Sequence, residues 1–187
     1  MKQIFITTVL LTVLWSCNNT TKRENSSIDE DKVENNNPNF GEYVSTLDQT
    51  PLPLKHNPMG QLPELSKNYD KSGFEKYKLS WTYQPLGIYY KDEKTIGILE
   101  YSIGDWGLVL FLITYDLKGN KIDSTGFYDK SGQDMGYYSI EHLTFNENRT
   151  VIVLDTVKRW DLNEDESDIV EGTLKMATGK VEYRILE

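Results

Sequence analysis

The stretch GLVLFLITYD, residues 107–116, decides the fold that we expect for this chain. Neighbouring side chains of a β-strand point to opposite faces of its sheet. The stretch would therefore place apolar residues on both faces: Leu108, Leu110 and Leu112 on one, and Val109, Phe111 and Ile113 on the other. A strand of this kind must be covered on both sides. We expect it to lie at the centre of the protein.

Segments rich in Ile, Val, Tyr, Phe and Thr surround this stretch and predict further strands. Short runs with turn chemistry join them, such as Asp92-Glu93, Ser131-Gly132 and Thr178-Gly179. Connections this short require antiparallel neighbours, because a parallel crossover needs about a dozen residues or more. The predicted strands are residues 86–91, 95–103, 107–116, 120–130, 136–146, 150–159, 168–177 and 181–186. The sequence thus predicts a mainly β fold, an antiparallel up-and-down meander of about eight strands that forms a curved open sheet or a partial barrel.

A short helix is predicted before the strands, where apolar residues recur at the helical spacing i, i+3, i+4 and i+7. These residues are Phe40, Tyr43, Val44 and Leu47. Asn39 is placed to cap the helix and Pro51 to stop it. Residues 74–79 are predicted to form another helical turn.

A proline-rich segment follows this helix and cannot hold regular structure for long, because each proline lacks a backbone donor. Its prolines are Pro53, Pro58 and Pro63. We interpret the segment as an extended wrap across the domain, with four buried side chains: Leu52, Leu54, Leu62 and Leu65. The helix and the wrap are expected to cover the second face of residues 107–116.

Composition divides the chain into a leader, a tether and one domain. Residues 17–39 are mostly Asn, Ser, Thr and charged side chains, which cannot bury enough apolar surface to fold, so we interpret them as a disordered tether. Residues 40–187 are expected to form a single β-rich domain that buries roughly two-thirds of its unfolded surface. The formal net charge of −9 disfavours nucleic acid as a partner, because phosphates would be repelled.

The first 16 residues have the layout of a signal peptide. Lys2 precedes an apolar run from Ile4 to Trp15, which is shorter than the roughly 20 apolar residues that a spanning helix needs. Cys17, the one cysteine of the chain, follows directly. The alternative is an ordinary signal peptide with an incidental cysteine, but an unpaired exposed thiol is unusual in an oxidising compartment.

The residues Leu14-Trp15-Ser16-Cys17 resemble the lipobox of bacterial lipoproteins, an aliphatic residue, a small residue, Gly, Ala or Ser, and then Cys. Leu14, Ser16 and Cys17 match this pattern, and Trp15 departs from it. The resemblance implies that Cys17 becomes the new N-terminus and carries lipid, palmitate included. Two or more acyl chains anchor a protein stably, since each buried methylene contributes about 0.8 kcal/mol.

The same resemblance implies a place in the cell envelope. Asn18 stands where lipoproteins that stay at the inner membrane carry an aspartate, so the outer membrane is expected. Both the periplasmic face and the cell surface stay open as alternatives. The stretch Tyr115 to Asp123 is similar to hairpins of uncharacterised lipoproteins of the Bacteroidota.

No catalytic motif is present in the sequence. A lipidated Cys17 leaves no free thiol, and His56 and His142 are far apart in the chain, so neither a cofactor nor a metal centre is expected. The chain also lacks a Gly-x-Ser-x-Gly elbow and a glycine-rich phosphate loop. We therefore expect a protein that is not an enzyme.

The acidic segment 161–168 begins like a calcium-binding loop. A helix-loop-helix site starting at Asp161 requires Gly at its sixth place and Glu at its twelfth, where this chain has Glu166 and Gly172. A solvated acidic loop and a loose calcium site are the two alternatives.

Tryptophans beside carboxylates are the candidate ligand-binding residues. Trp81, Asp105, Trp106 and Trp160 are placed at strand edges or loops, where an indole could stack on a sugar or grip a peptide. In the alternative interpretation these aromatic residues simply seal the ends of the sheet.

Three functions are consistent with these patterns. The first is a lipid-anchored, non-enzymatic envelope protein that binds an unknown protein or glycan. The second is an immunity or inhibitor protein against a toxin or hydrolase, and the third is an enzyme acting on envelope polymers. A dense exposed carboxylate surface would favour the inhibitor, and an aromatic-lined cleft would favour the ligand binder. The oligomeric state is left open.

Overall fold

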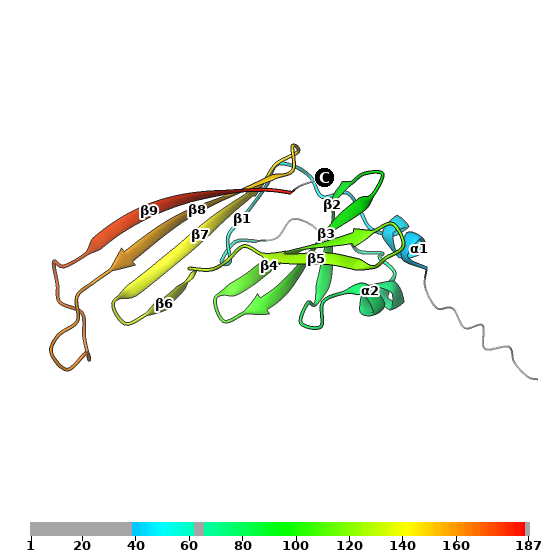
Figure 1. Cartoon of the computed structure of the whole chain (residues 1–187). Helices are drawn as coiled ribbons and strands as arrows, with labels where there is room; N and C mark the ends of the chain where they lie inside the picture. Colours follow the sequence, from blue (N-terminus) through cyan, green and yellow to red (C-terminus); the bar gives the residue numbers. More distant parts are fainter. Residues whose placement is uncertain (1–38, 62–65, 186–187) are drawn as a thin grey trace, which may run out of the picture. The chain divides into compact units, whose positions relative to one another are not determined.

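The structure is a computed structural model that describes residues 39–61 and 66–185 (Figure 1). All of them belong to one compact unit of the chain, residues 36–187. The predicted signal peptide, Cys17, nearly all of the predicted tether, and Leu62 and Leu65 of the wrap lie outside the described residues. Within the described residues, no helix is both long enough and apolar enough to span a bilayer.

The described residues are mainly β, with two short helices and nine strands. In chain order these are α1 (Phe40–Ser45), β1 (Leu54–His56), α2 (Lys71–Tyr77), β2 (Gln84–Lys91), β3 (Thr95–Gly104), β4 (Gly107–Asp116), β5 (Lys121–Gly126), β6 (Gly132–Asp134), β7 (Tyr137–Phe145), β8 (Thr150–Arg159) and β9 (Lys175–Arg184). Neighbouring strands pair antiparallel in open sheets. The predicted mainly β, antiparallel fold class is confirmed. Of the two predicted forms, an open sheet and a partial barrel, the open sheet is correct.

The strands are divided between two sheets rather than forming one continuous meander. The first sheet has the order β2-β3-β4-β5, and the second has the order β1-β7-β8-β9, with β6 paired to β7 (Figure 1). The chain leaves the first sheet after Gly126 and enters the second at Gly132. The predicted strand 120–130 is therefore too long, because its last residues cross between the sheets.

The largest error of the sequence prediction concerns the C-terminal segment. The predicted strands 168–177 and 181–186 are replaced by a loop and one strand, β9, which runs straight through the predicted turn Thr178-Gly179. Gly179 lies opposite Asp155 in the ladder, and a Cβ on Gly179 would lie 2.6 Å from the Asp155 Oδ2. The glycine therefore makes room for a buried carboxylate and does not mark a turn.

The helices begin at side-chain caps. Asn39 caps α1 as predicted, because its side chain accepts from the Gly41 N–H at 2.9 Å, and the helix ends at Ser45, before Pro51. Asp70 caps α2 in the same way, so this helix starts three residues before the predicted turn at 74–79.

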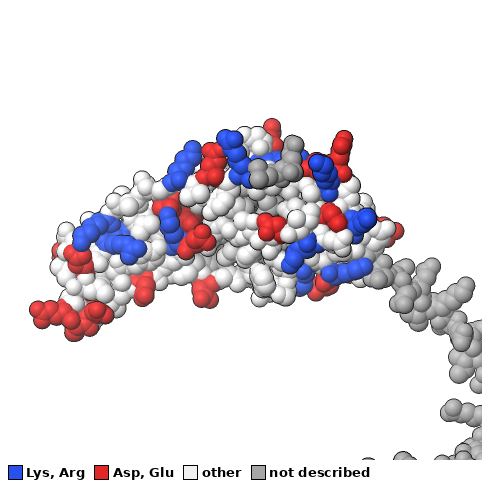
Figure 2. Space-filling view, viewed as in Figure 1, with Lys and Arg blue, Asp and Glu red and all other residues white. Residues whose placement is uncertain are grey.

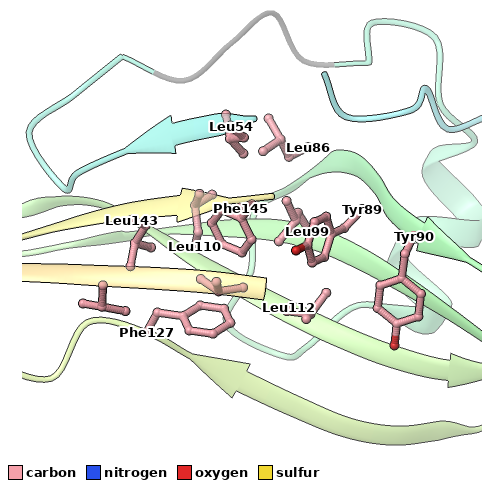
Figure 3. Close-up of a cluster of buried hydrophobic side chains, with 12 residues drawn as sticks. Leu54, Leu86, Tyr89, Tyr90, Leu99, Leu110, Leu112, Phe127, Leu143 and Phe145 are labelled. Atoms are coloured by element: carbon pink, nitrogen blue, oxygen red, sulfur yellow. The ribbon is translucent and has the colours of Figure 1, made fainter. Parts of the chain in front are cut away.

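One core lies between the two sheets (Figure 3). Leu110 and Leu112 of β4 face this core together with Leu143 and Phe145 of β7. The Phe145 ring meets the rings of Tyr89 and Phe127 edge-on, at centroid distances of 5.4 and 5.3 Å. The second sheet therefore covers one face of β4. Leu54 of the predicted wrap is also buried here, because β1 pairs with β7.

A second core lies under the two helices, on the other face of the first sheet. Phe40 and Tyr43 of α1 and Phe74 of α2 pack against Ile98 and Ile113. The predicted cover of the second face of residues 107–116 is confirmed for the helix, and α2 adds to it. Residues 107–116 are thus apolar on both faces because the helices cover one face and the second sheet covers the other.

A carboxyl group is buried in this second core. Glu100 is fully buried, and its Oε2 accepts from the Leu79 N–H and the Thr82 hydroxyl, while its Oε1 has no partner among the described residues. Burial raises the pKa of Glu100 from 4.5 to about 7. Burial, together with the Glu100 charge, also raises the pKa of the nearby Tyr43 hydroxyl. Glu100 is therefore largely protonated in the folded protein at mildly acidic pH.

Candidate ligand-binding site

The four predicted binding residues do not form one site. Trp81 is 56% exposed and touches Phe111 of the first sheet, with ring centroids 6.3 Å apart. Asp105 is exposed in the turn between β3 and β4. Trp106, in the same turn, lies against the second sheet, because a Cβ on Gly132 would be 4.0 Å from its indole nitrogen. Trp160, which follows β8, is the residue that lines a large cavity.

This cavity, which we call the distal cavity, has a volume of about 480 Å³. It is an open depression formed by β6, the β6–β7 turn, the start of β7, the end of β8 and the loop before β9. Its lining residues are Gln133, Asp134, Met135, Gly136, Tyr137, Tyr138, Lys158, Trp160, Asp168 and Ile169. The volume lies within the range of roughly 300–1,000 Å³ that is usual for small-molecule and side-chain sites.

The pairing of β6, β7 and β8 brings together the residues at the floor of the distal cavity. Tyr138 of β7 is paired with both Gln133 of β6 and Lys158 of β8, so these three side chains share one face of the second sheet. The Lys158 ammonium lies 5.5 Å from the centre of the Tyr138 ring, within the range of a cation–π contact. An aromatic ring with a cation above it therefore forms the floor.

The β6–β7 turn holds Trp160 at the wall of the cavity. The Trp160 N–H donates to the Gly136 carbonyl at 2.9 Å. Gly136 has a φ of +70°, and a Cβ there would lie 2.9 Å from the Trp160 carbonyl oxygen. The position therefore requires glycine, both for its left-handed backbone and for this close approach.

The loop after β8 is cross-linked by its own hydrogen bonds. The Val170 N–H donates to the Asp161 carbonyl at 2.8 Å, and the Asp161 carboxylate contacts the Lys175 ammonium at 2.6 Å. The Asn163 side chain accepts from the N–H groups of Ser167 and Asp168. These bonds place Asp168 and the neighbouring Ile169 beside Trp160 without help from a helix or strand.

The loop is strongly acidic, and its charged side chains are exposed. Between residues 161 and 171 it carries six carboxylates and no lysine or arginine: Asp161, Glu164, Asp165, Glu166, Asp168 and Glu171. Figure 2 shows red side chains gathered at the end of the molecule where this loop lies. The Ser167 hydroxyl and N–H hold the pKa of Asp165 below its usual range. The hydrogen bonds to Ser167 therefore favour the ionised form of Asp165.

No three His, Cys, Asp or Glu side chains are grouped as a metal site in the part of the chain that the structure describes. In the acidic segment 161–168, the Asp165 carboxylate accepts from the Ser167 hydroxyl at 2.6 Å, and the Asn163 side-chain oxygen accepts from the Ser167 backbone N–H. The two histidines lie on opposite faces of the second sheet: His56 is paired with Leu143 and buried, and His142 is exposed. Burial lowers the pKa of His56 to about 4.

Trp106 is not among the residues that line the distal cavity. It lines a small cavity of about 10 Å³ with Pro58, Met59 and Gly132, so it fills the space between the β3–β4 turn and β6. Tyr138 lines this small cavity as well as the distal cavity, so the two tryptophans Trp106 and Trp160 flank one tyrosine.

A scan against protein-family models, a search of the curated proteins and a search of the solved structures give no match to this chain. The assignment of function therefore depends on the residues themselves.

Sequence reasoning missed most of the distal cavity. Tyr138, Lys158, Asp134 and Asp168 are separated in the chain and meet through register and loop folding. The one usable signal was composition: Tyr137-Tyr138 follows a glycine turn, and Trp160 follows the basic pair Lys158-Arg159.

Proposed function

We propose that this chain is a lipid-anchored protein of the cell envelope that binds a ligand in the distal cavity and is not an enzyme. The observation that carries the proposal is the pairing of Trp160 and Tyr138 at the walls and floor of that cavity. Aromatic rings provide large contact areas at low entropic cost and dominate many binding sites. Asp134 and Asp168 add the few polar groups that such sites use to orient a ligand.

The anchoring part of the proposal rests on the N-terminal residues. Leu14, Ser16 and Cys17 match the lipobox pattern, and Cys17 would carry the acyl chains that hold the chain at the outer membrane. The lipid anchor would then hold the described domain at the membrane surface.

Replacing Cys17 with alanine is expected to abolish lipid attachment. Cells expressing either form are labelled with radioactive palmitate, and the chain is then immunoprecipitated and fractionated. The unchanged chain should carry label and sediment with membranes, whereas the Cys17→Ala chain should carry none and appear in the soluble fraction. A matched Ser16→Ala variant keeps a permitted small residue before the cysteine and should still be labelled. Label that survives Cys17→Ala would remove the anchor from the proposal.

Replacing Trp160 with alanine is expected to weaken ligand binding about thirtyfold or more, because a central aromatic contact contributes roughly 2 kcal/mol or more. The tagged Cys17→Ala chain is used to capture ligands from solubilised cell envelope, and the captured ligand is then titrated against each variant. Trp81→Ala is the matched control, since Trp81 is exposed and does not line the cavity. Thermal unfolding verifies that both variants fold. If Trp160→Ala and Trp81→Ala lost binding equally, the ligand-binding site would lie outside the distal cavity.

The immunity or inhibitor function is a second candidate, and the exposed acidic loop 161–171 favours it. Six carboxylates on one loop form a surface suited to a basic toxin or hydrolase surface. A toxin gene beside the gene for this chain, and protection of cells against that toxin, would separate it from a general ligand binder.

A further inference from the structure

The rings at this end of the second sheet already hold positive charges. The Lys158 ammonium lies over Tyr138 on one face, and the Arg159 guanidinium lies 4.9 Å from the centre of the Tyr137 ring on the other. Consecutive residues of β7 and of β8 thus repeat the same contact on both faces. The electron-rich faces of these rings attract cations. Trp160, the ring type that binds cations best, lines the distal cavity, and no cation from the described residues lies over its ring.

The electrostatic field around the distal cavity favours a cation as well. Asp134 and the six carboxylates of the 161–171 loop make seven acidic side chains, against three basic ones, Lys158, Arg159 and Lys175. Asp161 is already paired with Lys175. Asp134 and Asp168 line the cavity itself, and the one hydrogen bond described for each carboxylate comes from the N–H of the next residue, at 2.8 Å. Carboxylates around a shallow depression concentrate cationic groups there.

The rim of the cavity is apolar and exposed. Met135 is 50% exposed and Ile169 is 41% exposed. Met176 is not a lining residue, but it is paired with Lys158 in the ladder and is 62% exposed. An anion would meet the net negative charge, and a neutral saccharide would leave both carboxylates without a charged partner. A cationic side chain could contact both the aromatic rings and the carboxylates, and apolar residues next to it in the partner could pack against the apolar rim.

We propose that the distal cavity takes a lysine or arginine side chain from an apolar-flanked segment of a partner protein, with the cation placed between Trp160 and the carboxylates of Asp134 and Asp168. This inference rests on the proposed function and names the ligand class of the same site. The Lys158 ammonium then competes with the incoming side chain, which must either displace it or bind beside it in the cavity.

The test uses three soluble probes and the Cys17→Ala chain. The probes are a fluorescent hexapeptide of alternating Arg and Leu, a Glu-Leu hexapeptide of the same length, and a neutral chitin hexasaccharide. The Arg-Leu peptide is expected to bind best. Asp168→Asn should weaken its binding about two- to fivefold, because an attractive charge is lost. Lys158→Gln should strengthen binding by a similar factor, because a like charge is removed. Glu147→Gln, which makes the same charge change in the exposed β7–β8 turn, should alter binding less than twofold.

The outcomes separate this inference from the function on which it rests. Equal effects of Glu147→Gln and Asp168→Asn would show general charge attraction and overturn the inference. Preference for the Glu-Leu peptide or the saccharide, lost in Trp160→Ala and weakened in Lys158→Gln, would overturn the cationic ligand but keep the binding site. Probe binding that Trp160→Ala leaves unchanged would overturn both.

Discussion

Replacing Phe145 with alanine is expected to lower the free energy of unfolding by about 3–5 kcal/mol, the usual cost of deleting a buried phenylalanine. Phe145 is fully buried and joins the two sheets, since its ring contacts Tyr89 of β2 and Phe127 of the segment between them. Its register partners Leu54 and Val151 extend the contact across β1 and β8. The cavity left by alanine would therefore open where four segments meet.

Urea denaturation of the Cys17→Ala chain, followed by tryptophan fluorescence, measures this effect. His142→Ala is the matched control, because His142 lies on the exposed face of the same strand, where substitutions change stability by about 0.5 kcal/mol or less. If Phe145→Ala cost no more than His142→Ala, the two sheets would not share a cooperative core. A transition that splits into two steps would mean that the sheets unfold separately.

The second large effect concerns the pH dependence of stability at Glu100. Burial raises the pKa of this carboxyl in the folded protein to about 7, above the value of 4.5 that it has when exposed. Below pH 4.5 the carboxyl is protonated in both states, and its contribution to stability is fully present. As the pH rises, the unfolded chain releases its proton first, so this contribution is lost by the time the pH passes the folded pKa. The shift corresponds to about 3 kcal/mol.

Glu100→Gln removes this dependence while keeping the shape and an acceptor for the Leu79 N–H. The variant is expected to gain about 3 kcal/mol relative to the unchanged chain between about pH 4 and about pH 8, measured as the difference of two urea transitions. Glu93→Gln, at an exposed position in the β2–β3 turn, should follow the unchanged chain at both pH values. A Glu100→Gln curve parallel to that of the unchanged chain would mean that Glu100 is solvated or compensated in the folded state.

Much of the fold followed from periodicity. The bounds of β4 and β8 agree with the predicted strands 107–116 and 150–159, because in both an apolar face repeats every second residue and turn residues lie at the ends. The pattern of Leu110 and Leu112 against Ile113 also predicted two covered faces, and both covers exist. These features depend on neighbours in the chain, so the sequence alone carries them.

The C-terminal strand shows where local patterns fail. Thr178-Gly179 has the composition of a turn, but Gly179 is needed because it makes room for the carboxylate of Asp155, which lies 24 residues away in the chain. Asp155 is buried and pairs with the half-exposed Lys130 ammonium. The same holds for the candidate site. Trp160 was predicted from its residue type and its position in the chain. Tyr138 lies in the same cavity because β7 pairs with β8, and Asp168 lies there because of the fold of the loop.

Residue patterns along the chain were enough to predict the β class, the antiparallel connections, the two covered faces of β4 and the acidic net charge. The N-terminal pattern on which the proposed anchor depends is also local. The division of the strands into two sheets, and the choice of aromatic residues that face a cavity, became visible in the folded structure. The physical reason is that periodicity and turn chemistry act between residues close in the chain. The partner of each face, and the side chains that meet across strands, are set by contacts between distant segments.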